Sequence, residues 1–234
     1  MVSGYIVIFV ILALTKAAVD IRDVKISFPG TQNPKFPHLR FMQTLPAVRQ
    51  LTVCQRIKPF HRNTGYIFSC ATSNQDNQFI TSMYVKSDGT LNLGLQVNAS
   101  SNKYISCPIE IELGQWYHVC HVWSGVDGRM AVYANGSPCG TMENVGKGHQ
   151  ISAGGTVVIG QEQDKIGGGF EEQESWSGEL SDLQVWDEAL TTHQVSTVAS
   201  CNGIRPRGNV ISWMEDSFVA DDGVIVGISH MCSL

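Results

Sequence analysis

The sequence predicts an all-β protein folded as a flattened two-sheet antiparallel jelly roll, a lectin-like sandwich. Most segments are short, alternate apolar with polar residues, and are rich in Val, Ile, Tyr and Thr. Gly, Asn and Asp separate these segments at the spacing typical of sandwiches and jelly rolls. Helical periodicity is scarce, and a single short helix is expected near residues 192–200, after a hydroxyl cap at Thr191 or Thr192.

The clearest strands lie on either side of the turn at residues 125–128. Residues 116–123 form the first strand, and residues 130–133 form its partner, which ends at Asn135-Gly136. Further strands are expected at residues 51–54, 66–71, 79–85, 91–97, 156–161 and 182–186.

The N-terminus carries an apolar run at residues 5–14. This run is too short to span a bilayer, which needs about 20 residues, but it suits the hydrophobic region of a signal peptide. Thr15-Lys16-Ala17 places small residues at the two positions that a signal peptidase recognises. We expect residues 1–17 to be a signal peptide and residues 18–234 to form one secreted, extracellular domain without a transmembrane segment.

The charge balance is acidic, with 16 Lys and Arg against 21 Asp and Glu and a net charge of −5. Binding to phosphate backbones needs clustered basic residues, so this balance argues against nucleic acid as the primary ligand. It fits a protein that binds cations.

Seven cysteines in an exported chain predict disulfides rather than metal ligands, because there is no C-x-x-C pair and no His at zinc-finger spacing. An odd number leaves at least one thiol over, and spacing alone does not say which.

Acidic residues gather in the segment 161–174. Glu162 and Asp164 share a face at strand spacing, and the glycines 167–169 allow the chain to fold back so that Glu171 and Glu174 can meet them. Such carboxylates repel one another unless a cation cancels the charge, and calcium takes 6–8 oxygen ligands of this kind. The spacing does not fit an EF-hand loop, and a solvated acidic loop is the alternative on this segment alone.

The segment Gly160 to Phe170, GQEQDKIGGGF, resembles the calcium loop of the pentraxin family. Residues 51–54, 68–77 and 183–190 resemble the family in the same order, so the similarity covers nearly the whole mature chain. The family signature H-x-C-x-[ST]-W-x-[ST] is met at His118, Cys120 and Trp123, and it differs at Val122 and Gly125.

The resemblance implies two calcium ions per subunit, side by side on one face of the jelly roll. The matching ligand positions are Asp76, Asn77, Glu162, the Gln163 carbonyl, Asp164, Glu171 and Glu174. Glu162 and Asp164 would bridge both ions, which explains why so much negative charge is gathered in one loop.

The family further implies a non-enzymatic protein that recognises anionic head groups on microbial or damaged-cell surfaces, as a cyclic oligomer in innate immunity. The aromatic residue that packs against the head group in the family falls on Ser82 here, so the apolar wall for choline methyl groups is missing. We therefore favour phosphoethanolamine-like groups or acidic sugars over phosphocholine.

The family disulfide maps onto Cys54 and Cys120. Two more pairs, Cys107 with Cys139 and Cys201 with Cys232, resemble the extra bridges of arthropod pentraxins such as those of horseshoe crabs. These pairings leave Cys70, which is expected as a buried, inert thiol, with an interchain bond as the alternative. Asn98-Ala99-Ser100 is an N-glycosylation sequon.

Two other functions compete with this prediction. Some jelly-roll glycosidases carry E-x-D-x-x-E on one strand, and Glu162 and Asp164 begin that pattern, but the third acid falls on Gly167. A calcium-dependent adhesion lectin for neutral sugars would ignore phosphorylated head groups.

Overall fold

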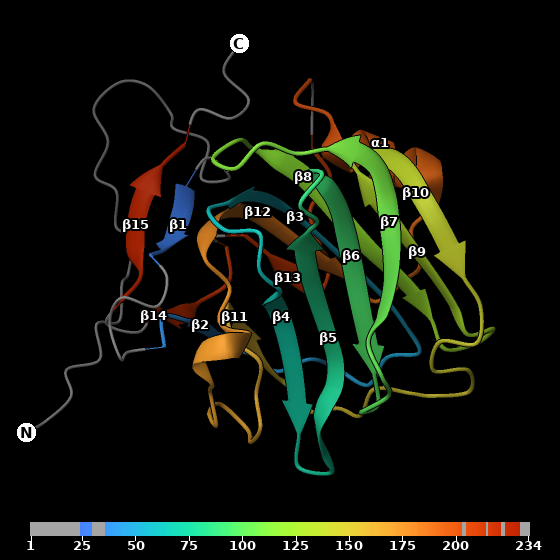
Figure 1. Cartoon of the computed structure of the whole chain (residues 1–234). Coiled ribbons are helices and arrows are strands. Elements are labelled where there is room, and N and C mark those ends of the chain that lie inside the picture. Colours follow the sequence, from blue (N-terminus) through green and yellow to red (C-terminus); the bar gives the residue numbers. More distant parts are fainter. Residues whose placement is uncertain (1–23, 30–35, 203–204, 214, 221–222, 230–234) are drawn as a thin grey trace, which may run out of the picture.

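Two antiparallel sheets pack face to face around the apolar core (Figure 1). The computed structural model describes residues 24–29, 36–202, 205–213, 215–220 and 223–229. The predicted signal peptide lies outside these residues. None of the helices among them is long and apolar enough to cross a membrane.

Sheet A is the front sheet of Figure 1. Its order is β14 (Phe218–Ala220), β2 (Leu39–Phe41), β11 (Thr156–Ile159), β4 (Gly65–Thr72), β5 (Gln75–Val85), β6 (Thr90–Val97) and β7 (Lys103–Glu110).

Sheet B lies behind it. Its order is β10 (Ser137–Met142), β9 (Arg129–Ala134), β8 (Tyr117–Ser124), β3 (Gln50–Pro59), β12 (Gly178–Trp186), β1 (Val24–Phe28) and β15 (Ile225–Ile228), with β13 (Ile211–Ser212) paired to β12. These sheets confirm the predicted two-sheet antiparallel fold.

The core lies between the sheets, where strand alternation directs every second side chain inward. Phe79 of sheet A is central, because its ring meets Phe68 at 6.1 Å and Trp123 of sheet B at 6.0 Å, both edge to face. All three side chains are fully buried. Burial of each such side chain stabilises the fold by about 1.5–3 kcal/mol.

The expected helix is present as α1 (Thr192–Ala199). Thr191 and Gln194 form a reciprocal capping box at its start, which pairs two otherwise unbonded main-chain N–H groups. Val195 and Val198 pack on the outer face of sheet B, in a second apolar cluster that contains Cys54 and Cys120.

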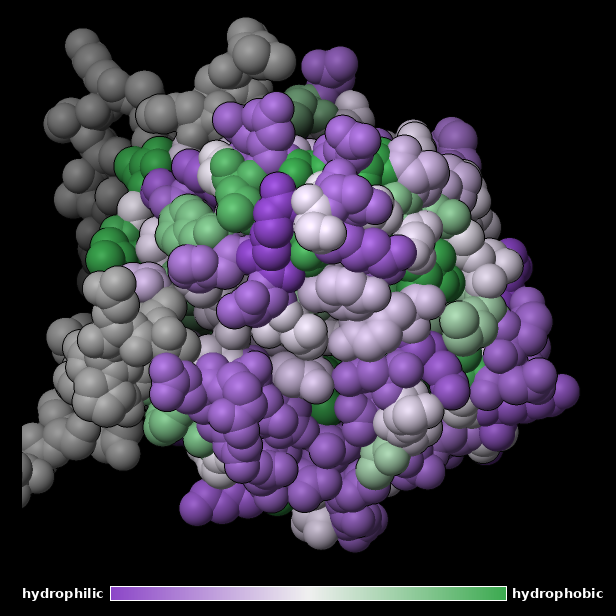
Figure 2. All heavy atoms as spheres, in the orientation of Figure 1, coloured by the Kyte–Doolittle hydropathy of each residue, from purple (hydrophilic) through white to green (hydrophobic). Residues whose placement is uncertain are grey.

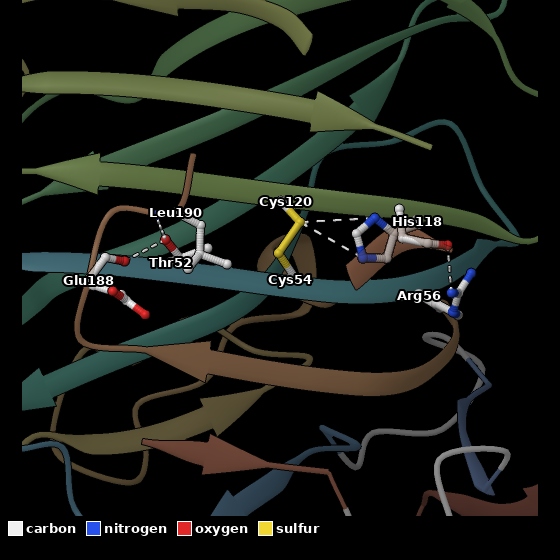
Figure 3. Close-up of a disulfide and its surroundings, with 8 residues drawn as sticks. Thr52, Cys54, Arg56, His118, Cys120, Glu188 and Leu190 are labelled. Carbon is white, nitrogen blue, oxygen red and sulfur yellow. Dashed lines mark hydrogen bonds between the residues drawn. A yellow bond between two sulfur atoms is a disulfide. The ribbon is translucent and has the colours of Figure 1, made fainter. Parts of the chain in front are cut away.

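Two disulfides link neighbouring or opposed strands in the way the resemblance implies. Cys54 in β3 is bonded to Cys120 in β8 (Figure 3), and Cys107 in β7 is bonded to Cys139 in β10, across one edge of the sandwich. Cys201 is also disulfide-bonded, whereas its expected partner, Cys232, lies outside the described residues. Cys70 is a free, buried thiol whose pKa is raised to about 12 by burial, so it is chemically inert.

His118 and His121 lie on opposite faces of β8, as the sequence predicts. Burial lowers the pKa of both rings to about 3, and the Arg56 charge adds to the effect at His118. Both histidines are therefore neutral groups of the fold rather than titrating site residues.

These histidines make the fold sensitive to acid. An unfolded imidazole takes up a proton below about pH 6.5, whereas the buried rings stay neutral down to about pH 3. The free energy of unfolding should therefore fall as the pH drops through this window, by about 1.4 kcal/mol per pH unit for each histidine. Denaturant unfolding at several pH values should show a shallower acid slope for His121→Leu, whereas the exposed His193→Leu should keep the wild-type slope. Equal slopes for all three proteins would contradict this origin of the acid sensitivity.

Candidate metal centre

The segment after β11 reverses direction at Gly160 and runs back over the outer face of sheet A. Gly160 has a φ of +90°, and a Cβ there would lie 2.6 Å from the Phe28 ring, so only glycine fits. The Ser69 hydroxyl, on the outer face of β4, donates to the Gln161 carbonyl at 2.9 Å and holds the returning chain against the sheet. The expected strand at 156–161 therefore ends at Ile159.

The buried Gln163 side chain holds the segment after β11 in place through hydrogen bonds to the strands beneath it and to Gly167. It is fully buried, and its Nε2 donates to the carbonyl oxygens of Ser69 at 3.1 Å and of Thr156 at 3.2 Å. Its Oε1 accepts from the Gly167 N–H at 2.8 Å. The side chain thus belongs to the scaffold, which leaves only the main-chain carbonyl as a ligand, as the resemblance implies.

A tight turn then folds the chain back on itself. Main-chain hydrogen bonds join Lys165 and Gly168 in both directions, at 3.2 and 2.9 Å. Gly169 follows with a φ of +80°, and a Cβ there would lie 2.7 Å from the Asp164 Cβ. The three glycines therefore return the chain toward Asp164, as the sequence predicts.

Three carboxylates meet as a result. One oxygen from each of Glu162, Asp164 and Glu174 lies within 4.8 Å of the others. We call this group the acidic cluster. Burial, together with the neighbouring Glu174 carboxylate, raises the pKa of Glu162 to about 8. Burial and the Asp164 charge likewise raise the pKa of Glu174. Without a cation, these side chains resist full ionisation.

The β4–β5 hairpin brings two more oxygen-bearing side chains to the acidic cluster. Asp76 lines a surface hollow together with Asp164. The Asn77 side chain interacts with Glu162 and opposes the rise of its pKa. Hydrophilic side chains cover this part of the molecule, at the lower end of the face drawn in Figure 2. Two segments more than eighty residues apart in the sequence therefore converge on one place.

Several oxygens at this place have no partner within the protein. With the carboxylates ionised, the Asn77 Oδ1 and the Oε2 atoms of Glu162 and Glu174 are buried and accept no hydrogen bond. A hydrogen bond between Glu162 and Glu174 needs a proton on one of the two. Buried polar atoms in folded proteins nearly always have a partner. The donor set is composed of oxygens alone, which suits a hard cation such as calcium and not the nitrogen and sulfur preference of zinc. The residues present thus fit the metal that the sequence predicts.

Two residues that the sequence predicts for the site, Glu171 and Ser82, do not lie in the acidic cluster. Glu171 is exposed and outside the acidic cluster, and its carboxylate accepts a hydrogen bond from Gln173. Ser82 is fully buried, and its hydroxyl donates to the Tyr104 hydroxyl at 3.3 Å. Tyr66, which was not among the predicted site residues, lies near the acidic cluster, because Glu174 and Glu162 act electrostatically on its hydroxyl.

The sequon borders the same site. Asn98 is exposed in the turn after β6, and the next residue, Ala99, donates its N–H to the Asn77 carbonyl at 2.8 Å. A sugar chain attached to Asn98 would therefore stand beside the hairpin that carries Asp76 and Asn77.

The fold and the cluster together define a lectin-like sandwich with an acidic, oxygen-lined centre on its loops. The Pentaxin family model matches residues 25–227. C-reactive protein 1.4 of Limulus polyphemus is 33% identical over 234 residues, which cover 98% of this chain and 94% of that protein. Human neuronal pentraxin-2 is 30% identical over 194 residues, covering 82% of this chain and 43% of that protein. The chain belongs to the pentraxin family.

Solved structures with the same fold are more distant in sequence. The full extracellular region of zebrafish Gpr126/Adgrg6 superposes with a TM-score of 0.62 and 20% identity, over 91% of this chain and 28% of that one. Domains LG4-5 of the mouse laminin alpha1 chain give a TM-score of 0.52 and 16% identity, over 82% of this chain and 45% of that one. These likenesses support the lectin-like sandwich.

The close approach of Gly169 to Asp164 can be tested directly. We expect Gly169→Ala to loosen the turn and to speed tryptic cleavage after Lys165 several-fold, because the new methyl group collides with Asp164. Gly154→Ala is the matched control, since Gly154 has a φ of +85° but nothing within 4 Å of its added Cβ. Limited proteolysis followed by mass spectrometry measures both. Cleavage after Lys165 at the same rate in Gly169→Ala, Gly154→Ala and the wild-type protein would contradict the close approach of Gly169 to Asp164.

Proposed function

We propose that this pentraxin is a secreted, calcium-dependent pattern-recognition protein that binds phosphorylated or other anionic head groups. The observation that carries the proposal is the convergence of unpartnered, buried oxygens from two distant segments, Asn77 on one side and Glu162 with Glu174 on the other. A solvated acidic loop would instead leave its carboxylates apart and in water.

Seven groups would hold two calcium ions per subunit: Asp76, Asn77, Glu162, the Gln163 carbonyl, Asp164, Glu171 and Glu174. Glu162 and Asp164 would contact both ions, which would offset the burial and the repulsion from Glu174 that raise the pKa of Glu162. Glu171 would join from its exposed position next to the cluster. Calcium with open coordination positions binds phosphate, sulfate or carboxylate oxygens directly. The candidate ligands are phosphoethanolamine-like groups, acidic sugars and phosphocholine.

The same geometry argues against hydrolysis as the function. Retaining glycosidases place two carboxylates about 5–5.5 Å apart on either side of a glycosidic bond. Glu162 is only 4% exposed, so a substrate does not reach its carboxylate. The third position of the glycosidase pattern is Gly167, whose N–H is bonded to Gln163. We therefore expect a binding protein without enzymatic activity.

A single small site gives weak attachment, and repetition of the site would strengthen it. A cyclic oligomer that presents several copies on one side gains avidity on a surface of repeated head groups. The similarity to horseshoe-crab C-reactive proteins supports this arrangement and a role in innate immunity at microbial or damaged-cell surfaces.

Retention on a ligand matrix tests the proposal most simply. The mature protein should be retained on immobilised phosphoethanolamine in millimolar calcium and eluted by a chelator, because the metal joins protein to ligand. A neutral-sugar matrix run in parallel should retain nothing. Retention that persists in the chelator, or on the neutral sugar alone, would defeat the mechanism.

Two glutamate variants test the cation site itself. Glu162→Gln should weaken calcium binding at least tenfold in calorimetry, because one shared ligand charge is lost. In the absence of calcium at neutral pH the same variant should raise the melting temperature, because folding no longer has to protonate a buried carboxyl whose pKa is raised to about 8 by burial and by Glu174. Glu172→Gln, at an exposed neighbour outside the acidic cluster, should change neither quantity. A loss of stability in Glu162→Gln without calcium would mean that Glu162 has a structural role instead.

A further inference from the structure

The Cys54–Cys120 disulfide has a third metal-ligating side chain beside it, that of His118 (Figure 3). The two ring nitrogens of His118 lie 3.8 and 3.9 Å from the Cys120 Sγ. One ligand atom from each of the three residues lies within 4.8 Å of the others. All three side chains are buried. We call them the sulfur–histidine group.

The pairing of two central strands of sheet B produces this group. His118 and Cys120 are two residues apart on β8, so their side chains leave the same face of the strand. Cys54 of β3 pairs directly with Cys120, with 4.1 Å between the two Cα atoms. Because Cys54 precedes Cys120 by 66 residues, the spacing of ligands along the chain does not reveal the group.

The distances in the sulfur–histidine group suit a single metal ion. Zinc binds sulfur at about 2.3 Å and imidazole nitrogen at about 2.0–2.1 Å, so two such ligands of one tetrahedral ion lie roughly 3.6 Å apart. The distance from the His118 ring to the Cys120 Sγ is already close to this value. Since the strand pairing holds Cys54 opposite Cys120, rotation of the two cysteine side chains is enough to place both sulfurs around an ion.

The surroundings favour the forms of these side chains that bind metal. Burial, together with the Arg56 charge, lowers the pKa of His118 to about 3, so the ring is neutral and able to coordinate a cation. Arg56 pairs with His118 across the two strands, and its positive charge also favours a thiolate over a thiol. Thiolate and imidazole ligands select thiophilic cations, whereas calcium prefers oxygen.

Helix α1 covers the sulfur–histidine group. Val195 and Val198 of this helix belong to the same apolar cluster as Cys54 and Cys120. An isolated helix of eight residues is not stable in water, so α1 depends on its packing and on its capping box. Local opening of such an element takes less free energy than global unfolding. A reductant and a metal ion would therefore reach the group when α1 lifts from the sheet.

We propose that reduction of the Cys54–Cys120 disulfide turns the sulfur–histidine group into a binding site for one thiophilic metal cation, such as zinc, cadmium or monovalent copper. A dithiol supplies the two electrons and two protons that convert the S–S bond into two thiols, and it becomes a disulfide itself. The cation then displaces the two thiol protons to solvent and is held by two thiolates and the neutral His118 ring. Oxidation to the disulfide closes the site, because it leaves no thiolate to bind the metal.

Cadmium titration of the reduced protein tests this proposal. Cadmium bound to thiolates gives an ultraviolet charge-transfer band, so binding to carboxylates at the acidic cluster does not contribute to the signal. The mature protein is reduced with a dithiol, freed from it without air, and titrated with cadmium. The band should appear and saturate, and the melting temperature should rise, because the ion binds the folded state. The same protein without reduction should show no band.

Two buried histidines on one strand give matched variants. His118→Leu should weaken cadmium binding at least tenfold, since even the loss of an outer-shell partner of a metal costs about 10–100-fold. His121→Leu is the control, because His121 is equally buried on the opposite face of β8, and it should keep the affinity. Both are measured in a Cys107→Ala/Cys139→Ala/Cys201→Ala background, which removes the other disulfide-bonded cysteines of the described residues.

Equal cadmium affinity in the two histidine variants would overturn the site. A charge-transfer band of undiminished strength in a reduced Cys54→Ala/Cys120→Ala variant would overturn it as well. If circular dichroism shows that reduction unfolds the protein, refolding on addition of cadmium would support the site, because metal binding and folding are then coupled. A reduced protein that stays unfolded in cadmium would overturn it.

Discussion

Repulsion among three crowded carboxylates, of which Glu162 is buried, is the constraint on which the candidate site of this protein depends. Glu162, Asp164 and Glu174 bring oxygens within 4.8 Å of one another, and burial with the adjacent charges raises the pKa of Glu162 to about 8. Such an arrangement opposes folding unless a cation or protons offset the charge. The buried Gln163 side chain and the glycine turns hold the chain in this unfavourable place. This unfavourable free energy is expected at a site that binds a cation, because the bound cation offsets it. An ordinary surface loop would have no such compensation.

The sandwich makes this convergence possible through the order of its strands. β11, β4 and β5 are consecutive in sheet A. Because β11 is antiparallel to β4, it ends at the far end from the β4–β5 hairpin, and the segment that runs back from Gly160 over the outer face brings the carboxylates to that hairpin. The core beneath them is rigid, with edge-to-face aromatic contacts between the sheets and a disulfide from β7 to β10 at the far edge. A site on loops gains its precision from such a support.

Local patterns in the sequence were sufficient for the fold and for most of the acidic cluster. The alternation of residues 116–123 and the hydroxyl cap at Thr191 depend on near neighbours, and both appear in the structure. The strand β10 was not predicted, because Ser137-Pro138-Cys139-Gly140 has no clear alternation of apolar and polar residues. The preceding Asn135-Gly136 pair, with positive φ at both residues, is a typical hairpin turn and was the available signal for this strand.

The position of Ser82 under Tyr104 shows why the rest could not be predicted. Which residue faces the site depends on the register of four strands, from Tyr66 to Tyr104, and register is set by pairings across the whole sheet. Counting from Asp76 along a single strand reaches Ser82 but says nothing of the ring that covers it. The exposure of Glu171 has a different, local cause, since hydrogen bonds from Gln173 and Ser175 hold Glu171 within its own short segment. The residues that surround Ser82 are therefore set by pairings across the sheet, which no single stretch of the sequence reveals.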